Sequence, residues 1–132
     1  LTGGRAHCQF EEVAAECGLT FHFHQRSGSS APAGHMFEIS GGGIGVLDFD
    51  LDGWPDVYLS QGCDWPPADR DDAPLDQLFH NQRGTSFASV TPACAIREAD
   101  YGQGVAVGDL NNDGFPDLYV TNIGVNRLWI NQ

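Results

Sequence analysis

The sequence contains 132 residues, enough for one ordinary domain with a hydrophobic core, and its formal net charge is −12. All six basic residues are arginine, so the chain offers little to neutralise phosphate groups, and we expect neither nucleic acid binding nor membrane insertion. No stretch approaches the roughly 20 apolar residues of a membrane-spanning helix. The 17 glycines and 7 prolines favour short strands and turns over long helices. No signal peptide opens the sequence, which we read as a mature or excised segment.

The first unit of the sequence begins at residue 8, after a patternless lead-in over residues 1–7. Its opening segment, CQFEEVAAECGLTFHFHQ, predicts at most one helical turn over residues 13–17 and a strand over residues 20–24. A later segment, SFASVTPACAI, aligns with it without gaps, 77 residues further on. The aligned pairs are Phe10 with Phe87, Val13 with Val90, Cys17 with Cys94, and Leu19 with Ile96. The chain therefore contains an internal repeat.

Two acidic stretches follow one plan, GIGVLDFDLDGWPDVYLSQG at residues 43–62 and GVAVGDLNNDGFPDLYVTNIG at residues 104–124. In both, Asp or Asn occupies relative positions 1, 3, 5 and 9, glycine occupies position 6, and proline occupies position 8. Short β-prone runs flank each loop, at residues 43–47, 56–60, 105–107 and 118–121. We therefore expect each stretch to form a β-hairpin whose loop carries the acidic side chains.

This spacing of oxygen-bearing side chains is typical of a calcium loop, because Ca²⁺ prefers about six to eight oxygen ligands gathered by one folded segment. Glycine at position 6 permits the sharp turn, and the residue at position 7 would add its backbone carbonyl. The predicted ligands of two Ca²⁺ sites are Asp48, Asp50, Asp52, Trp54 and Asp56, and Asp109, Asn111, Asp113, Phe115 and Asp117. An EF-hand is excluded because its position 12 requires a bidentate Glu, where this chain has Leu59 and Val120. Asn111 replaces one carboxylate, so we expect the second site to be the weaker.

A third matched piece follows each acidic hairpin, as LFHNQ at residues 78–82 and LWINQ at residues 128–132, with a strand expected at residues 128–130. The matched pieces divide the chain into two homologous units, residues 8–83 and 84–132. The first unit carries two insertions, at about residues 25–42 and 63–76, which read as irregular loops. Repeats of this length built from short strands predict an all-β fold of β-propeller-like blades.

The stretches GIGVLDFDLDGWPDVYLSQG and YGQGVAVGDLNNDGFPDLYVTNIGVNRLWIN resemble FG-GAP (VCBS-type) repeats. Such repeats form the calcium-loop blades of integrin α-subunit propellers and of cartilage-acidic-protein-like (ASPIC/UnbV-type) secreted bacterial proteins. The pieces FEEVAAECGLTFHFH and LFHNQRGTSFASVT resemble the segments between loops in that second family. The resemblance implies a β-propeller, an extracellular location, structural Ca²⁺ in each loop, and adhesive or matrix roles. A closed propeller takes about four or more blades, whereas this chain supplies about two.

Four cysteines, an even number, accompany the calcium loops: Cys8, Cys17, Cys63 and Cys94. None forms a CxxC motif, which argues against a zinc ribbon or a thioredoxin-like site. We expect an oxidising, extracellular setting with up to two disulfides. Three pairings are possible, and buried free thiols are the alternative.

His22 and His24 face one side of the predicted strand and could join His35 or His80 in a Zn²⁺ or Cu²⁺ site, although solvent-facing histidines are the favoured interpretation.

These features predict a non-enzymatic, extracellular, calcium-binding structural or adhesion module. Two blades leave sheet edges without partners, so we expect the chain to self-associate as a fibre or ring, or to form part of a larger propeller. One alternative is a calcium-dependent, glycan-active enzyme domain that uses Glu38 or Asp100, for which an exposed Trp65 could serve as a carbohydrate platform. Another alternative is an integrin-like face that binds an extracellular protein through the insertion at residues 63–76.

Overall fold

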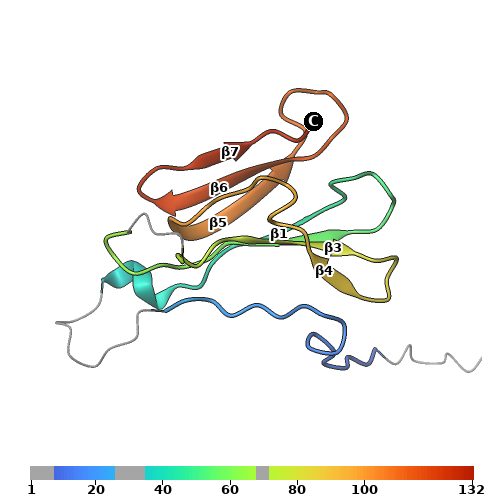
Figure 1. Ribbon diagram of the computed structural model, residues 1–132, viewed down its shortest axis with the longest axis horizontal. Helices are drawn as coiled ribbons and strands as arrows, with labels where there is room; N and C mark the ends of the chain where they lie inside the picture. Colours follow the sequence, from blue (N-terminus) through green and yellow to red (C-terminus); the bar gives the residue numbers. More distant parts are fainter. Residues whose placement is uncertain (1–7, 26–34, 68–71) are drawn as a thin grey trace, which may run out of the picture.

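A computed structural model of the chain describes residues 8–25, 35–67 and 72–132 (Figure 1). The expected lead-in, and part of each expected insertion, lie outside these residues. Apart from one 3-10 turn, η1 (Met36–Ile39), the regular structure in the described part is all-β, which confirms the predicted class. The strands are β1 (Ile44–Leu47), β2 (Asp56–Leu59), β3 (Gln77–Asn81), β4 (Phe87–Ser89), β5 (Tyr101–Gly108), β6 (Asp117–Ile123) and β7 (Arg127–Trp129).

The strands form two antiparallel sheets, one with the order β1-β2-β3-β4 and one with the order β5-β6-β7. Within each sheet the first two strands form a hairpin that closes at the acidic loop. Leu47 pairs with Asp56 at the end of the first hairpin, and Gly108 pairs with Asp117 at the end of the second. The predicted hairpins are therefore confirmed, and the sheets account for two FG-GAP-type blades; the described residues close no propeller ring.

The fourth strand of the first sheet comes from beyond residue 83, where we placed the end of the first repeat unit. In β4, Ser89 pairs with Phe79 and Phe87 pairs with Asn81. The segment that aligns with β4 in the first unit, around Phe10, belongs to no strand, and the Phe10 side chain is 92% exposed. The boundary of the sheet thus lies several residues later than the boundary of the sequence repeat.

The strand predicted over residues 20–24 is wrong, because that segment forms no backbone ladder in the structure. It is held instead by one side chain: Gln61 Nε2 donates to the carbonyl of His22 at 3.0 Å, and the amide of His24 donates to Gln61 Oε1. The single helical turn is confirmed, since the Cys17 amide donates to the Val13 carbonyl at 2.9 Å.

The two sheets meet where β1 lies against β5, and together they enclose one core (Figure 1). Gly43 requires its lack of a side chain there, because a Cβ atom would lie 2.6 Å from the backbone of Gly104. Buried residues of both sheets, together with Ile96 from the segment between β4 and β5, form the core cluster: Leu47, Tyr58, Leu78, Ile96, Leu118 and Val120. The two sheets therefore share one apolar core. This packing holds the two hairpins, and the acidic loop that closes each of them, in fixed positions relative to each other. In the described part of the chain, no helix is long and apolar enough to cross a membrane.

Candidate metal centre

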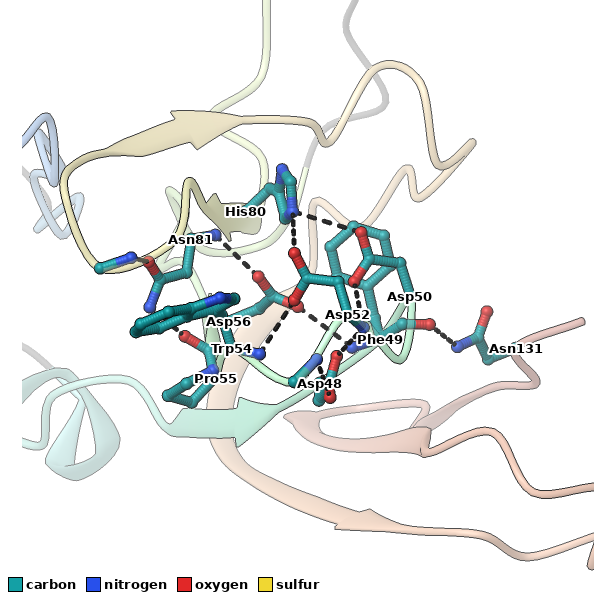
Figure 2. A network of polar contacts seen from close by, with 12 residues as sticks. Asp48, Phe49, Asp50, Asp52, Trp54, Pro55, Asp56, His80, Asn81 and Asn131 are labelled. Carbon is teal, nitrogen blue, oxygen red and sulfur yellow. Dashed lines mark hydrogen bonds and ion pairs between the residues drawn. The ribbon is translucent and has the colours of Figure 1, made fainter.

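The first acidic loop folds back so that its backbone amides point at its own carboxylates (Figure 2). The amide of Asp52 donates to Asp48 Oδ1 at 3.0 Å and lies 3.3 Å from Asp50 Oδ1, and the Gly53 amide donates to Asp48 Oδ2 at 2.9 Å. Two left-handed residues make this turn, Leu51 with φ 58° and Gly53 with φ 88°. The local backbone therefore holds the side chains at positions 1, 3 and 5 together.

Asp56, at position 9, closes the loop from the start of β2 and is completely buried. Its Oδ2 accepts a hydrogen bond from the Phe49 amide at 3.1 Å, and its Oδ1 accepts one from the Asn81 amide at 2.7 Å. Burial raises the pKa of the Asp56 carboxyl, and these two hydrogen bonds oppose the rise. Carboxylate oxygens of Asp48, Asp50 and Asp56 lie within 4.8 Å of one another, so the three side chains converge on one point.

The second loop repeats this arrangement with a different sequence. The Asp113 amide lies 3.1 Å from both Asp109 Oδ1 and Asn111 Oδ1, and the Gly114 amide donates to Asp109 Oδ2 at 2.9 Å. Asp117 occupies position 9 and is 1% exposed. It accepts hydrogen bonds from the amides of Leu110 and Asn131, which stand at the positions of Phe49 and Asn81 in the first unit. Left-handed residues again make the turn, Asn112 with φ 60° and Gly114 with φ 95°. The two copies of the loop pattern thus share one backbone turn and matching hydrogen bonds to their carboxylates.

The donor set suits a hard divalent cation. Each loop gathers carboxylate or amide oxygens, the ligand type that Ca²⁺ prefers, and the first loop concentrates four formal negative charges that an ion would offset. At position 7, the amides of Trp54 and Phe115 donate to Asp52 Oδ1 and Asp113 Oδ1, both at 2.9 Å. The carbonyl groups of Trp54 and Phe115 remain predicted ligands. The residues present therefore fit the ion that the loop spacing predicts.

One side chain beside the first loop was not assigned to it from the sequence. His80, on β3, places Nε2 3.2 Å from Asp50 Oδ2 and 3.6 Å from Asp52 Oδ2 (Figure 2). The matching residue in the second unit is Ile130, so a polar side chain stands where the repeat has an apolar one. That mismatch between LFHNQ and LWINQ was the sequence signal that could have pointed to His80.

The two units are also linked directly beside the first loop, because Asn131 Nδ2 donates to the Phe49 carbonyl at 2.7 Å.

In the described part of the chain, no other histidine joins His80 in a metal-compatible cluster. His24 Nε2 lies 3.0 Å from Asp64, while His35 stacks on Phe37 with ring centroids 5.1 Å apart. Among the described residues, the metal-compatible clusters contain His80 as their one histidine. The alternative of a Zn²⁺ or Cu²⁺ site around His22 and His24 therefore receives no support from the structure.

The remaining sequence candidates have structural neighbours of their own. The four cysteines (Cys8, Cys17, Cys63 and Cys94) are free thiols, so none of the expected disulfides forms in the structure. Trp65 is half-buried and meets Phe37 edge-on at 5.2 Å rather than standing free as a platform. Glu38 accepts a hydrogen bond from the His35 amide at 3.0 Å, and Asp100 pairs with Arg127 at 2.9 Å.

A second acidic network lies away from the loops, between β2 and the segment before β3. Asp76 is completely buried and accepts hydrogen bonds from the Tyr58 hydroxyl at 2.6 Å and the Gln61 amide at 2.7 Å. Its amide donates to the carbonyl of Glu98, whose own carboxylate is 1% exposed and lies 3.1 Å from Arg127 Nε. Burial raises the pKa of Asp76 to about 7, although the hydrogen bonds from Tyr58 and Gln61 lower it. Sequence reasoning missed this network because Asp76 lies in an acidic, proline-rich insertion.

Comparison with known proteins agrees with the geometry of the two hairpins. The model of the FG-GAP-like repeat family matches residues 48–120, which run from the first acidic loop into β6. Human (Homo sapiens) integrin alpha-7 is 31% identical over 80 residues, which cover 58% of this chain and 7% of the integrin. The chain thus corresponds to a small part of that relative. Since the family match covers more than half of the sequence and both blades carry the loop, this chain belongs to the FG-GAP-like repeat family.

Proposed function

We propose that this chain is a calcium-stabilised pair of propeller-type blades that serves as an extracellular adhesion or ligand-binding module. The observation that carries the proposal is the repeated loop, in which two copies of one sequence pattern adopt the same turn and matching hydrogen bonds from backbone amides to carboxylates. A solvated acidic turn would explain one such loop, but two with matched buried carboxylates indicate a shared ligand. In this role, calcium stabilises the folded loops.

The charge on the loops explains why an ion would stabilise the blades. Like charges about 4 Å apart repel by about 4 kcal/mol at the effective dielectric constant of a protein surface. The carboxylate oxygens of Asp48, Asp50 and Asp56 lie within 4.8 Å of one another, so repulsion of this kind destabilises the folded first loop. A divalent cation held by these side chains offsets the repulsion, and the proline at position 8 limits the freedom that the loop loses on binding.

The likeness to an integrin supports the extracellular, adhesive side of the proposal, and exposed apolar residues on the second sheet support association. Leu78 in β3 is 2% exposed, whereas Leu128 at the matching position in β7 is 51% exposed, and Val125, just before β7, is 65% exposed. Strand β3 has β4 on its outer side, whereas no described strand pairs with the outer side of β7. We infer that further blades or a second copy cover this edge.

Thermal melting with and without calcium tests the proposed function. Bound ligand at about 100 times its Kd stabilises the folded state by about 2.7 kcal/mol for each site. We therefore expect the melting temperature to rise with Ca²⁺ and to fall when a chelator is added. Asp52→Ala and Asp113→Ala should each remove part of this response, while Glu11→Ala, which removes an exposed charge outside the loops, should retain all of it. If the melting temperature of the parent chain did not change with calcium, the proposal would be overturned.

Sedimentation in the presence of calcium tests the proposed association separately. A stable monomer would contradict that part of the proposal.

A further inference from the structure

The two acidic loops have different neighbours on the adjoining strand, and the calcium proposal does not use this difference. In the first loop, His80 reaches Asp50 and Asp52 from the neighbouring strand β3, whereas the second unit has Asn111 and Ile130 at the positions of Asp50 and His80. We propose that His80 is a metal ligand at the first loop, where it forms with Asp50 and Asp52 a mixed nitrogen–oxygen centre for Zn²⁺. This inference rests on the proposed role of the first loop as a divalent-cation site, and it extends that role to a different class of metal.

The distances agree with direct coordination. A tetrahedral Zn²⁺ ion with bonds of about 2.0–2.1 Å holds its ligand atoms about 3.3 Å apart. The distances from His80 Nε2 to the two carboxylate oxygens, 3.2 Å to Asp50 and 3.6 Å to Asp52, lie on either side of that value. The three ligand atoms all lie within 4.8 Å of one another, so one ion can contact all three after small side-chain movements.

The state of the imidazole nitrogen is an independent observation. His80 Nε2 is shielded from solvent, and it makes a hydrogen bond to no described residue even though two carboxylate oxygens are close. This buried nitrogen lies close to two carboxylate oxygens and makes no hydrogen bond, so it is available to coordinate an ion that they also bind. The ring as a whole is 27% exposed, so an ion can enter from solvent.

The ring is also held in position by its surroundings. His80 lies in the middle of β3, where its backbone pairs with Ala88 of β4. Phe49 packs against the imidazole edge-on, with ring centroids 5.7 Å apart and an interplanar angle of 73°. Asp50 and Asp52 are fixed in turn by the hydrogen bonds of the loop. The three ligands therefore need little ordering to bind, which reduces the entropic cost of coordination.

Ligand chemistry selects the metal. Imidazole nitrogen suits Zn²⁺ and similar transition metals, whereas carboxylates and carbonyls alone suit Ca²⁺ and Mg²⁺. The second loop offers oxygen only, because Ile130 brings no ligand atom. The chain would therefore carry one loop that takes Ca²⁺ alone and one that also takes Zn²⁺. A simple ion pair between a protonated His80 and the two carboxylates is the competing explanation, and it predicts no zinc binding.

Zinc titration by calorimetry in metal-free buffer distinguishes these explanations, with the parent chain, His80→Ile and a His22→Ala/His24→Ala double variant. We expect His80→Ile, which copies the second unit, to weaken Zn²⁺ binding by at least about 10- to 100-fold, and the double variant to bind like the parent. Calcium binding by His80→Ile should persist, which separates this inference from the proposed function. Undiminished zinc binding by His80→Ile, or its loss in the double variant, would overturn the inference.

A measurement on the unmodified chain guards against a variant that fails to fold. Direct coordination should shift the ¹⁵N resonance of His80 Nε2 when one equivalent of Zn²⁺ is added, and this shift should exceed the one that Ca²⁺ on the neighbouring carboxylates produces. An unchanged His80 ring signal at saturating zinc would show that the imidazole is not a ligand.

Discussion

The buried carboxyl of Asp76 predicts a particular dependence of stability on pH. Asp76 is completely buried between Tyr58 and Gln61, and burial raises its pKa to about 7 from an ordinary value of 3.8. Between these two values the folded chain keeps a proton that the unfolded chain releases. The folded state thus binds more protons than the unfolded state, so the free energy of unfolding falls as pH rises through this window.

The size of the effect follows from the difference between the two pKa values. Each pH unit within the window lowers the free energy of unfolding by up to about 1.4 kcal/mol, or about 4 kcal/mol over the three units between pH 4 and 7. Asp76→Asn removes the titration while its amide oxygen still accepts from the Gln61 amide. The hydrogen bond from Tyr58 must then rearrange, which costs about 1 kcal/mol at all pH values.

Urea denaturation at several pH values, in constant saturating calcium, measures this difference. We expect the parent chain to lose stability between pH 4 and 7 relative to Asp76→Asn, and the variant to be the more stable of the two above pH 7. Burial also raises the pKa of Glu98, but Glu98 is present in both chains and largely cancels in the comparison. Parallel stability curves for the two chains would refute the reasoning that Asp76 is a buried, proton-binding group.

Two further substitutions test the packing of the blades and their buried charge. Leu78→Ala should lower the free energy of unfolding by about 2–5 kcal/mol, because Leu78 is 2% exposed, whereas Leu128→Ala at the matching, half-exposed position should cost less than about 1 kcal/mol. If Leu78→Ala and Leu128→Ala lost equal stability in urea denaturation, the assignment of Leu78 to the core would be contradicted. Arg127→Ala should lower the free energy of unfolding by about 1–3 kcal/mol, because it leaves the buried Oε2 of Glu98 without its hydrogen-bond donor, while the half-exposed guanidinium is itself partly screened by solvent. An unchanged melting temperature for Arg127→Ala would show that this pair does not stabilise the fold.

The acidic hairpins were predictable because their determinants are local. Alternate carboxylates, a glycine at the left-handed turn position and flanking β-prone residues all lie within one short stretch, so reading residues 43–62 was enough to place β1, β2 and the loop between them. The same argument placed β5 and β6. Internal repetition then supported both assignments, since chance does not readily produce two such loops.

The features that were missed depend on contacts between distant residues. Strand β4 pairs across the predicted unit boundary, and no local pattern indicates the partner of a three-residue strand. The alternation around Phe21 and Phe23 resembles a strand, but the side chain of Gln61 binds that backbone in place of a ladder. His80 reaches the first loop only because β3 pairs with β2. Asp76 is buried only because Tyr58 and Gln61 satisfy its oxygens.

Calorimetric titration with Ca²⁺ in metal-free buffer tests the central claim most directly, because it counts the sites. The parent chain should bind two calcium ions, Asp52→Ala and Asp113→Ala should each bind one, and the double variant should bind none. Glu11→Ala, which removes the same charge outside the loops, should still bind two. Two ions bound by the double variant, or none bound by the parent chain, would contradict the assignment of the acidic loops as calcium sites.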